Sequence, residues 1–211
     1  MIELYTWTTP NGQQASIFLE ETGLDYKVIP VDLQNGDQRG DEFTALNPNQ
    51  KIPAIVDPDV KGDPVRLFES GAILIYLAEK TGTFLPQEGA ERAEVLQWLM
   101  YQMSHVGPIL GQANHFATHS EPIQYAIDRF INEGVRIVGV LNTGLEGHEY
   151  LAGQYSIADI ATYPWVSAAW GPFVTMMPEK AGAMTNVKAW LDRLGAREAV
   201  QRGMAVPTAP A

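Results

Sequence analysis

The sequence predicts a small α/β domain followed by an all-helical domain. Over about the first 82 of its 211 residues, short β-rich segments alternate with helical patterns, the order expected of strands joined by helices across one sheet. Beyond residues 83–90 the β-rich segments disappear and long helical patterns replace them. We therefore expect domains at residues 1–82 and 91–204, a linker at 83–90 and a flexible tail at 205–211.

The α/β order rests on the signals that begin and end each element. Gly23 and Gly82 each follow a helical pattern and fit the left-handed residue that ends many helices. Pro53 stands near the start of a β-rich segment, where a strand tolerates a proline, and the turn-rich residues 58–64 predict a hairpin. Strands are expected at residues 2–7, 26–32, 51–57 and 65–68, and helices at residues 12–22, 41–46 and 71–81.

The helical domain is predicted from long amphipathic patterns. Gly107-Pro108 falls inside the first of them and predicts a bend, because proline removes a helical hydrogen bond. Ser156 and Asp159 have the spacing of a capping box, with Asp in place of Glu, and Pro164 predicts a kink in the helix that follows. Helices are expected at residues 91–116, 125–145 and 187–194, with another beginning after residue 156.

Charge and hydropathy exclude several classes of function. The formal net charge is −11, and a field of that sign repels nucleic-acid backbones and anionic lipid. We therefore expect no nucleic-acid partner and no membrane partner. No apolar run approaches the length of a membrane span, and no secretion signal is visible near the N-terminus. These features predict a cytoplasmic protein.

The chain contains no cysteine. This excludes disulfides, thiolate zinc sites, iron–sulfur clusters and a cysteine nucleophile. His115 and His119 stand four residues apart, but no third ligand with a supporting spacing accompanies them, so no metal site is expected. If thiol chemistry takes place here, the sulfur must arrive with a ligand.

Two strand-to-helix junctions carry side chains suited to a charged ligand. Thr9 and Asn11 stand at the first junction, where the N–H groups and dipole of a helix N-terminus favour an anion. On spacing alone, however, the favoured interpretation is that one of them caps the helix. Glu69 and Ser70 stand at the second junction and suit an amino-acid head group, with the alternative that Ser70 is an N-cap preceded by a solvated acid.

Four segments of the chain, residues 33–43, 47–57, 68–79 and 155–159, occur in a characteristic order together with Pro164-Trp165. In these segments and their order the chain resembles the glutathione transferase family over nearly its whole length. This resemblance implies a thioredoxin-like N-terminal domain, a short linker and an all-α C-terminal domain, which is the cytosolic glutathione transferase fold. The Thr-Pro-Asn-Gly turn after the first strand is similar to that of the bacterial Nu-class branch, which is akin to disulfide-bond oxidoreductases.

The resemblance also implies which residues hold glutathione. Pro53 matches the family's cis-proline, although the frequency of cis bonds alone favours a trans bond. Ile52 then pairs its backbone with the cysteinyl part of the ligand, and Glu69 and Ser70 hold the γ-glutamyl head group. The remaining matches are Gln38 and Lys51 near the glycyl end, Arg129 reaching the ligand from the helical domain, and Thr9 and Asn11 facing the thiol.

Thr9 and Asn11 are thus the predicted catalytic residues. A free thiol has a pKa near 8.5, so only about 3% is thiolate at pH 7, and the thiolate is the nucleophile. Hydrogen bonds from these side chains can stabilise the thiolate, but neither side chain is a useful base. The family's usual Tyr or Ser is absent from this turn, unless Tyr5 serves, and Ser16 is interpreted as packing or capping.

Three functions remain open at this point. The first is a disulfide-bond reductase that uses the thiol of bound glutathione. The second is a glutathione S-transferase or lyase acting on a small aromatic electrophile, in a pocket lined by Phe116 and Trp165 unless those residues are helix-bundle core. The third is a non-enzymatic glutathione-binding regulatory module. The expected partners are glutathione or oxidised glutathione as cosubstrate, a small electrophile or disulfide, and a second copy in a homodimer.

Overall fold

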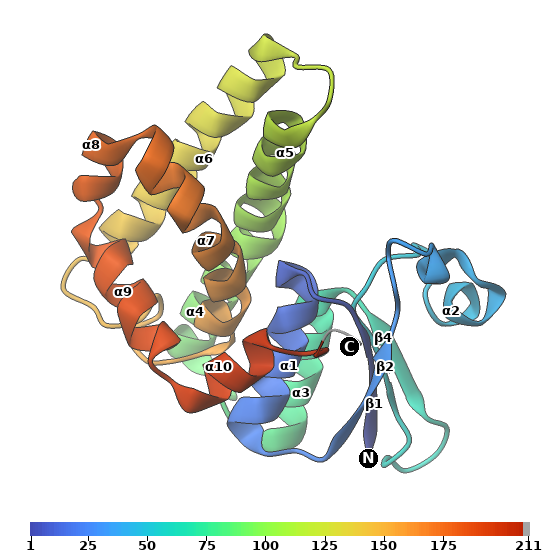
Figure 1. Cartoon of the computed structure of the whole chain (residues 1–211). Helices are drawn as coiled ribbons and strands as arrows, with labels where there is room; N and C mark the ends of the chain where they lie inside the picture. Colours follow the sequence, from blue (N-terminus) through green and yellow to red (C-terminus); the bar gives the residue numbers. More distant parts are fainter. Residues whose placement is uncertain (209–211) are drawn as a thin grey trace. The chain divides into compact units, whose positions relative to one another are not determined.

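The computed structural model describes residues 1–208, and the chain forms two compact units (Figure 1). The first unit contains Met1–Leu85 together with the described residues from Gly195 onward, and the second contains Pro86–Leu194. The predicted fold class, an α/β region followed by a helical region, is confirmed. The predicted domain boundaries stay a prediction. They place the residues after Gly195 in the helical domain and tail, whereas these residues cluster with the first unit.

The first unit is built on one mixed sheet. Its strands are β1 (Ile2–Thr6), β2 (Tyr26–Pro30), β3 (Ala54–Asp57) and β4 (Val65–Phe68). They lie in the order β2-β1-β3-β4, with β1 parallel to β2 and antiparallel to β3, and β3 antiparallel to β4. β3 is shorter than predicted because it begins only after Pro53, which has no N–H to donate to the ladder.

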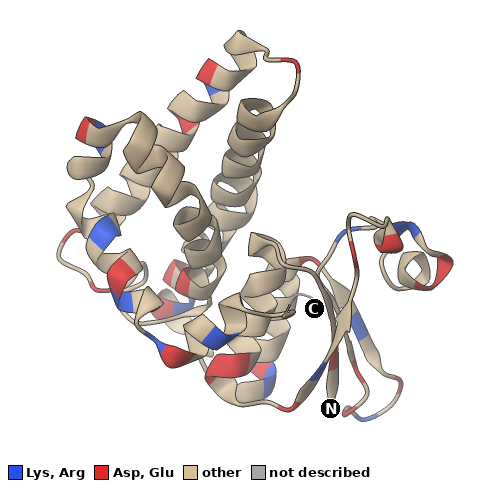
Figure 2. Cartoon of the chain, viewed as in Figure 1, with Lys and Arg blue, Asp and Glu red and all other residues tan. Residues whose placement is uncertain are grey.

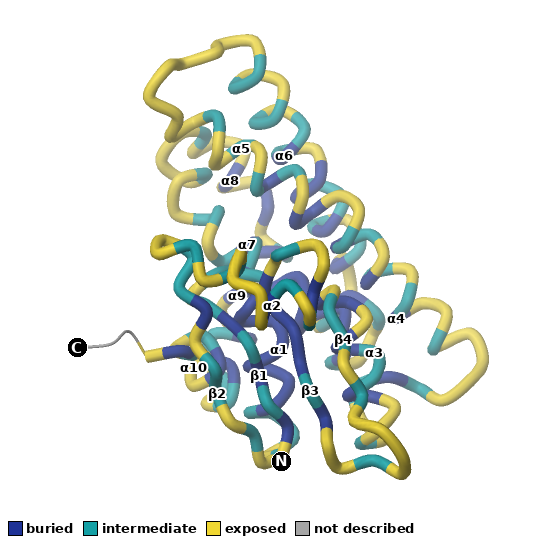
Figure 3. Tube along the Cα trace, turned by 90° about the vertical axis from the view of Figure 1, so that its right-hand side faces the viewer, coloured by how far each residue is buried: buried dark blue, intermediate teal, exposed yellow. Residues whose placement is uncertain are grey.

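Helices cover both faces of this sheet. They are α1 (Pro10–Thr22), the 3₁₀ turn η1 (Asp37–Arg39), α2 (Asp41–Leu46) and α3 (Ser70–Thr81), and α10 (Glu198–Met204) packs on α1. Alternate residues of β1, beginning with Ile2 and Leu4, are buried on the face that carries α1 and α3 (Figure 3). Tyr5 points to the other face and packs with Phe43 of α2, at a ring centroid distance of 6.2 Å. Gly23 and Gly82 end α1 and α3 in the left-handed conformation, as predicted.

The second unit is helical. Its elements are α4 (Gly89–Tyr101), the π-helical turn η2 (Gln102–Val106), α5 (Gly107–Thr118), α6 (Gln124–Gly144), α7 (Ile157–Met176), α8 (Pro178–Gly182) and α9 (Thr185–Gly195). The helix predicted for residues 91–116 is therefore divided by a π-helical turn, just before Pro108 in the first turn of α5. Among the described residues, none of the helices combines the length and apolar character needed to cross a membrane.

The predicted capping box at the start of α7 is confirmed. The Ser156 side chain accepts a hydrogen bond from the N–H of Ala158 at 3.3 Å, and Asp159 accepts one from the N–H of Ser156 at 3.1 Å. The helix continues through Pro164. Sequence patterns did not predict α8 or α10, because both are short and only long helices give a strong periodic signal.

The structure describes the first four residues of the predicted tail, residues 205–208. Pro207 is buried, and its carbonyl accepts a hydrogen bond from the Thr8 hydroxyl at 3.4 Å. The flexibility of the tail stays a prediction. Residues 209–211 lie outside the described residues.

Candidate functional site

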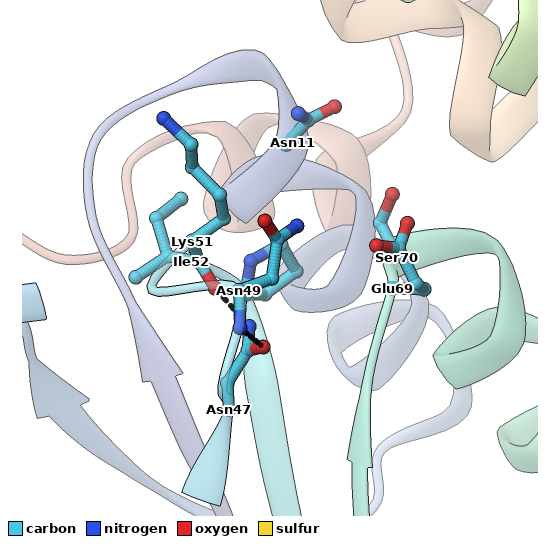
Figure 4. Close-up of a pocket in the computed structure, with 8 residues that line it drawn as sticks. Asn11, Asn47, Asn49, Lys51, Ile52, Glu69 and Ser70 are labelled. Atoms are coloured by element: carbon cyan, nitrogen blue, oxygen red, sulfur yellow. Dashed lines mark hydrogen bonds between the residues drawn. The ribbon is translucent and has the colours of Figure 1, made fainter. Parts of the chain in front are cut away.

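The sheet register brings three loop ends to one edge of the first unit. Tyr5 of β1 lies opposite Ala54 of β3, which lies opposite Phe68 of β4. The residues that follow β1, precede β3 and follow β4 must therefore meet at the same edge. A cavity of about 140 Å³ lies there (Figure 4), lined by Asn11, Asn47, Asn49, Lys51, Ile52, Pro53, Glu69 and Ser70.

Most of the predicted glutathione-binding residues of the first unit share this cavity. Lys51, Ile52 and Pro53 come from the loop before β3, and Glu69 and Ser70 come from the junction of β4 and α3. In Figure 4, the side-chain oxygens of Glu69 and Ser70 lie on one side of the site and the exposed side chain of Lys51 on the other. The site therefore offers a carboxylate and an ammonium group at opposite ends, which suits a ligand that carries both charges.

Asn47 fixes the loop that carries Lys51. Its side chain is buried and donates from Nδ2 to the Lys51 carbonyl at 2.6 Å, while its Oδ1 accepts from the N–H of Asn49 at 2.9 Å. The Ile52-Pro53 bond that follows is cis, as the family resemblance implied and contrary to the frequency argument. Asn47 and Asn49 were not predicted as site residues. The signal was present, because an Asn-Pro-Asn run is typical of a turn closed by a side chain.

Glu69 has an unusual backbone conformation at the edge of the cavity. Its φ is +71° and its ψ is 111°, a region that residues with a side chain rarely occupy. Such conformations cluster at ligand-binding sites, where the surrounding structure holds them. The prediction that Ser70 is the N-cap is wrong, because α3 begins at Ser70 itself and Glu69 occupies the cap position. The reversal of chain direction between β4 and α3 takes place at Glu69.

Thr9 is the N-cap of α1. Its hydroxyl oxygen accepts a hydrogen bond from the N–H of Gly12 at 3.3 Å, so the capping interpretation describes its geometry. A hydroxyl can donate while it accepts, so capping leaves the predicted role towards a thiolate open. Asn11 lines the cavity and Thr9 does not belong to the lining set. The structure thus places Asn11 directly at the site, and Thr9 lies two residues before it in the chain.

Tyr5, the alternative to the family's usual tyrosine, lies outside the cavity lining. Its hydroxyl donates to Glu3 at 3.2 Å, and its ring packs against Phe43 on the α2 side of the sheet. Burial raises the pKa of Tyr5, and the neighbouring Glu3 carboxylate raises it further. A phenol with a raised pKa remains protonated at neutral pH. The cavity-lining set contains no tyrosine.

The remaining predicted residues lie away from this cavity's lining set. Gln38 is in η1, and its side-chain oxygen is buried without a hydrogen-bond partner. Arg129 is an exposed residue of α6, within the helical unit. Their predicted roles towards glutathione stay predictions.

The two aromatic residues predicted for an electrophile pocket pack within the helical unit. Phe116 stacks on Phe130 with ring centroids 5.3 Å apart. Trp165 lies so close to Gly107 and Gly111 that a Cβ at either glycine would be 3.2 to 3.3 Å from its ring. These contacts are those of helix-bundle packing, and an electrophile pocket formed by Phe116 and Trp165 stays a prediction.

The acidic and histidine side chains do not form a metal centre in the part of the chain that the structure describes. No group of three or more His, Cys, Asp or Glu residues within it is arranged to hold a metal ion. His115 and His119 face each other at a ring centroid distance of 5.6 Å, without a third ligand of this kind.

Comparison with known proteins identifies the family. Residues 1–79 match the glutathione S-transferase N-terminal domain. The chain is 49% identical to the disulfide-bond oxidoreductase YfcG of Escherichia coli K12, over 97% of this chain and 94% of the relative. It is 40% identical to the disulfide-bond oxidoreductase YghU of the same organism, over 97% of this chain and 74% of the relative. The chain therefore belongs to the glutathione S-transferase family.

Solved structures agree with this assignment. A glutathione transferase from Burkholderia graminis, crystallised with two glutathione molecules per subunit, matches with a TM-score of 0.94 and 46% identity over 99% of this chain and 89% of that one. A glutathione transferase from Pseudomonas putida, with one glutathione disulfide bound per subunit, matches with a TM-score of 0.91 and 42% identity over 98% and 91% of the two chains.

Proposed function

We propose that this protein is a glutathione-dependent disulfide-bond reductase, and that glutathione is its cosubstrate. One observation carries the proposal. Three loop ends form a single cavity with Glu69 and Ser70 at one side, Lys51 at the other and Asn11 beside it, in a chain that has no cysteine. The relatives named as disulfide-bond oxidoreductases, and the similar structures with glutathione or its disulfide bound, support the same reading.

The charges of the cavity define how glutathione would lie in it. Its γ-glutamyl ammonium would pair with the Glu69 carboxylate, and its α-carboxylate would lie at Ser70 in the first turn of α3, where the helix dipole favours an anion. Its cysteinyl backbone would lie along Ile52, and its glycyl carboxylate near Lys51 and Gln38. Arg129 would reach the ligand from α6, as the family resemblance implies.

Asn11 and Thr9 would stabilise the thiolate of the bound tripeptide. Lowering the pKa of the thiol by about 2 units, which corresponds to about 2.7 kcal/mol, would convert most of it to thiolate at pH 7. A side-chain amide, a hydroxyl and the N-terminus of α1 are donors of the kind that stabilise a sulfur anion. Because these groups stabilise a charge and accept no proton, their role is electrostatic.

The proposed reaction has two exchange steps. The bound thiolate attacks one sulfur of a disulfide, the sulfur–sulfur bond breaks, and one substrate thiolate leaves and takes up a proton. A second glutathione thiolate then attacks the mixed disulfide at the glutathione sulfur, the mixed sulfur–sulfur bond breaks, and the second substrate thiolate leaves and takes up a proton. The net change is that two glutathione molecules become one glutathione disulfide while one substrate disulfide becomes two thiols.

Substrate preference tests this function. With purified protein and glutathione, turnover of hydroxyethyl disulfide should exceed conjugation of chlorodinitrobenzene by at least about tenfold in kcat/KM. The reverse order would instead support the second candidate, a transferase or lyase acting on an aromatic electrophile. That candidate is favoured by the similar solved structures that are named glutathione transferases. Binding of glutathione without turnover of either substrate would support a non-enzymatic regulatory module.

The Nu-class assignment, the homodimer and the cytoplasmic location belong to the same proposal. The Thr-Pro-Asn-Gly turn supports the class, and the family resemblance supports the dimer. Light scattering coupled to size-exclusion chromatography should give twice the chain mass of 23.2 kDa. A mass of one chain at micromolar concentration would contradict the dimer.

A further inference from the structure

The C-terminal segment, which we define as residues 197–207, runs along α1. At the C-terminal end of α1, Arg197 donates two hydrogen bonds to Glu21, at 2.7 and 2.8 Å, and Arg202 donates to Glu20 at 2.7 Å. In Figure 2 the ribbon of this segment is blue at basic positions close to the red, acidic positions of α1, and the two ion pairs join these positions. These ion pairs attach the segment to the end of α1 that lies furthest from Thr9.

Two hydrogen bonds attach the segment nearer the start of α1. The Ser16 hydroxyl donates to the Gly203 carbonyl at 2.7 Å, and Gln13 Nε2 donates to the Met204 carbonyl at 3.0 Å. Both side chains are buried, and their spacing of three places them on one face of the helix. The two carbonyls belong to the last turn of α10, where carbonyls lack partners within the helix. The Gly203 carbonyl also accepts from the N–H of Val206 at 3.3 Å, so α1 and the backbone that follows together satisfy the end of α10.

The two helices also approach closely through their backbones. A Cβ built on Gly203 would lie 2.5 Å from the Cα of Ile17 and 2.6 Å from its nitrogen. Backbone atoms cannot move aside as the end of a flexible side chain can, so this contact fixes where α10 lies along α1. The hydrogen bonds and the glycine contact together define one register between the two helices.

The contacts of the segment flank the turn that holds Asn11. On one side of the turn the Thr8 hydroxyl donates to the Pro207 carbonyl at 3.4 Å, and on the other Gln13 binds Met204. Gly12, inside the turn, packs against the end of β1, because a Cβ there would be 2.3 Å from the Trp7 carbonyl oxygen. The turn is thus held by β1 and by the C-terminal segment.

We propose that the C-terminal segment is a positioning element of the glutathione site, and that Gln13 and Ser16 are its positioning residues on α1. They do not line the cavity, but they set where the first turn of α1 places Asn11 and Thr9. A misplacement of about 1 Å in a reacting group can reduce the rate about 100-fold. The inference rests on the proposed function, since the quantity it controls is the pKa of the glutathione thiol.

The test compares Gln13→Ala and Ser16→Ala with Thr22→Val. The control removes a hydroxyl that also donates to a backbone carbonyl, that of Phe18 at 2.9 Å, but at the far end of α1 and within the helix itself. For each protein the ultraviolet absorbance of the thiolate gives the pKa of bound glutathione, calorimetry gives its Kd, and thermal melting gives Tm. The pKa is the readout that a loss of stability alone does not change.

Gln13→Ala and Ser16→Ala should each raise the pKa of the bound thiol by about 0.5 to 1 unit and lower kcat/KM for hydroxyethyl disulfide about three- to tenfold. Thr22→Val should leave both at the wild-type value. If the two variants lower Tm and leave the pKa unchanged, the contacts are structural and the proposal is wrong. If the wild type itself binds no glutathione, the proposed function fails first, and calorimetry on the wild type separates the two failures.

Discussion

Helices α3 and α7 begin in opposite ways. α7 begins with a buried capping box, in which Ser156 and Asp159 satisfy the N–H groups of the first turn. α3 begins beside a cavity, after an exposed Glu69 that has a φ of +71° and makes no side-chain cap hydrogen bond. The difference distinguishes two roles of a helix N-terminus. Where side chains of the core bind its N–H groups, the N-terminus stabilises the fold. Where it follows a residue with a strained backbone at the edge of a cavity, it is suited to bind a ligand.

Breaking the start of α7 should have the largest effect on stability. Asp159 accepts hydrogen bonds from the N–H groups of Leu151 and Ser156, the Ser156 hydroxyl and Trp190 Nε1, at 2.9 to 3.2 Å. Asp159→Ala leaves these buried donors unsatisfied and should lower the free energy of unfolding by about 3–5 kcal/mol. Urea denaturation measures the change.

The matched control for this prediction is Asp192→Ala. Asp192 is an exposed acid of α9 that pairs with Lys188. An exposed pair of this kind contributes about 0.5 kcal/mol, so the control should unfold almost as the wild type does. Equal losses in the two variants would show that the burial of the capping box adds nothing.

Changing the start of α3 should affect ligand binding and stability in opposite directions. Glu69→Gly removes the carboxylate proposed to bind the γ-glutamyl ammonium and should weaken glutathione binding about 100-fold. Glycine adopts a positive φ readily, so the same change should raise the free energy of unfolding by about 1 kcal/mol. Calorimetry and urea denaturation of one preparation measure both. A variant that is destabilised and binds normally would reverse the assignment of the two helix starts.

The capping box also predicts a pH dependence of stability. Burial raises the pKa of Asp159 to about 6, although its four donors act in the opposite direction, and the unfolded value is about 3.9. Between these values the folded state binds more protons than the unfolded state. The stabilisation of the folded state by the protonation of Asp159 is therefore complete below about pH 3.9 and is lost as the pH rises through 6.

Asp159→Asn isolates this titration because the amide does not ionise. Between about pH 4 and 6, the free energy of unfolding of the wild type should fall relative to that of the variant, by up to about 1.4 kcal/mol per pH unit. Chemical denaturation at several pH values measures the two curves. Parallel curves across this window would mean that the pKa of Asp159 is the same in the folded and unfolded states.

The smallest effect is expected at the cap of α1. Thr9→Ala removes the hydroxyl that accepts from Gly12 and should lower the free energy of unfolding by about 0.5–1 kcal/mol. Thr9→Ser keeps the hydroxyl and should restore stability to within a few tenths of a kcal/mol. If Thr9→Ser also restores the pKa of the bound thiol, the hydroxyl serves both the helix and the ligand. A raised thiol pKa in both variants would assign the effect to the threonine methyl group.

The fold could be predicted from local signals because those signals are strong in this chain. Gly23 and Gly82 mark helix ends through their left-handed conformation, and Ser156 with Asp159 marks a helix start. The position of α10 could not be predicted. Its placement on α1 depends on side chains from residues far apart in the sequence, such as Ser16 and Gly203, and no local pattern records that pairing.

The candidate site was predictable only in part. The family resemblance brought Ile52, Pro53, Glu69 and Ser70 together, and the structure places them in one cavity. The buried role of Asn47 depends on a hydrogen bond within its own loop, and the conformation of Glu69 depends on the strand and helix that it joins. Sequence spacing alone cannot distinguish Glu69, an acid held at a cavity, from an acid that is simply exposed to solvent.

The central claim is that a chain with no cysteine borrows the thiol of glutathione and activates it beside Asn11. The most direct test is an ultraviolet titration of the wild-type protein saturated with glutathione. We predict that the bound thiol ionises with a pKa of about 6.5, roughly 2 units below that of a free thiol. A bound thiol that titrates near 8.5 would contradict it.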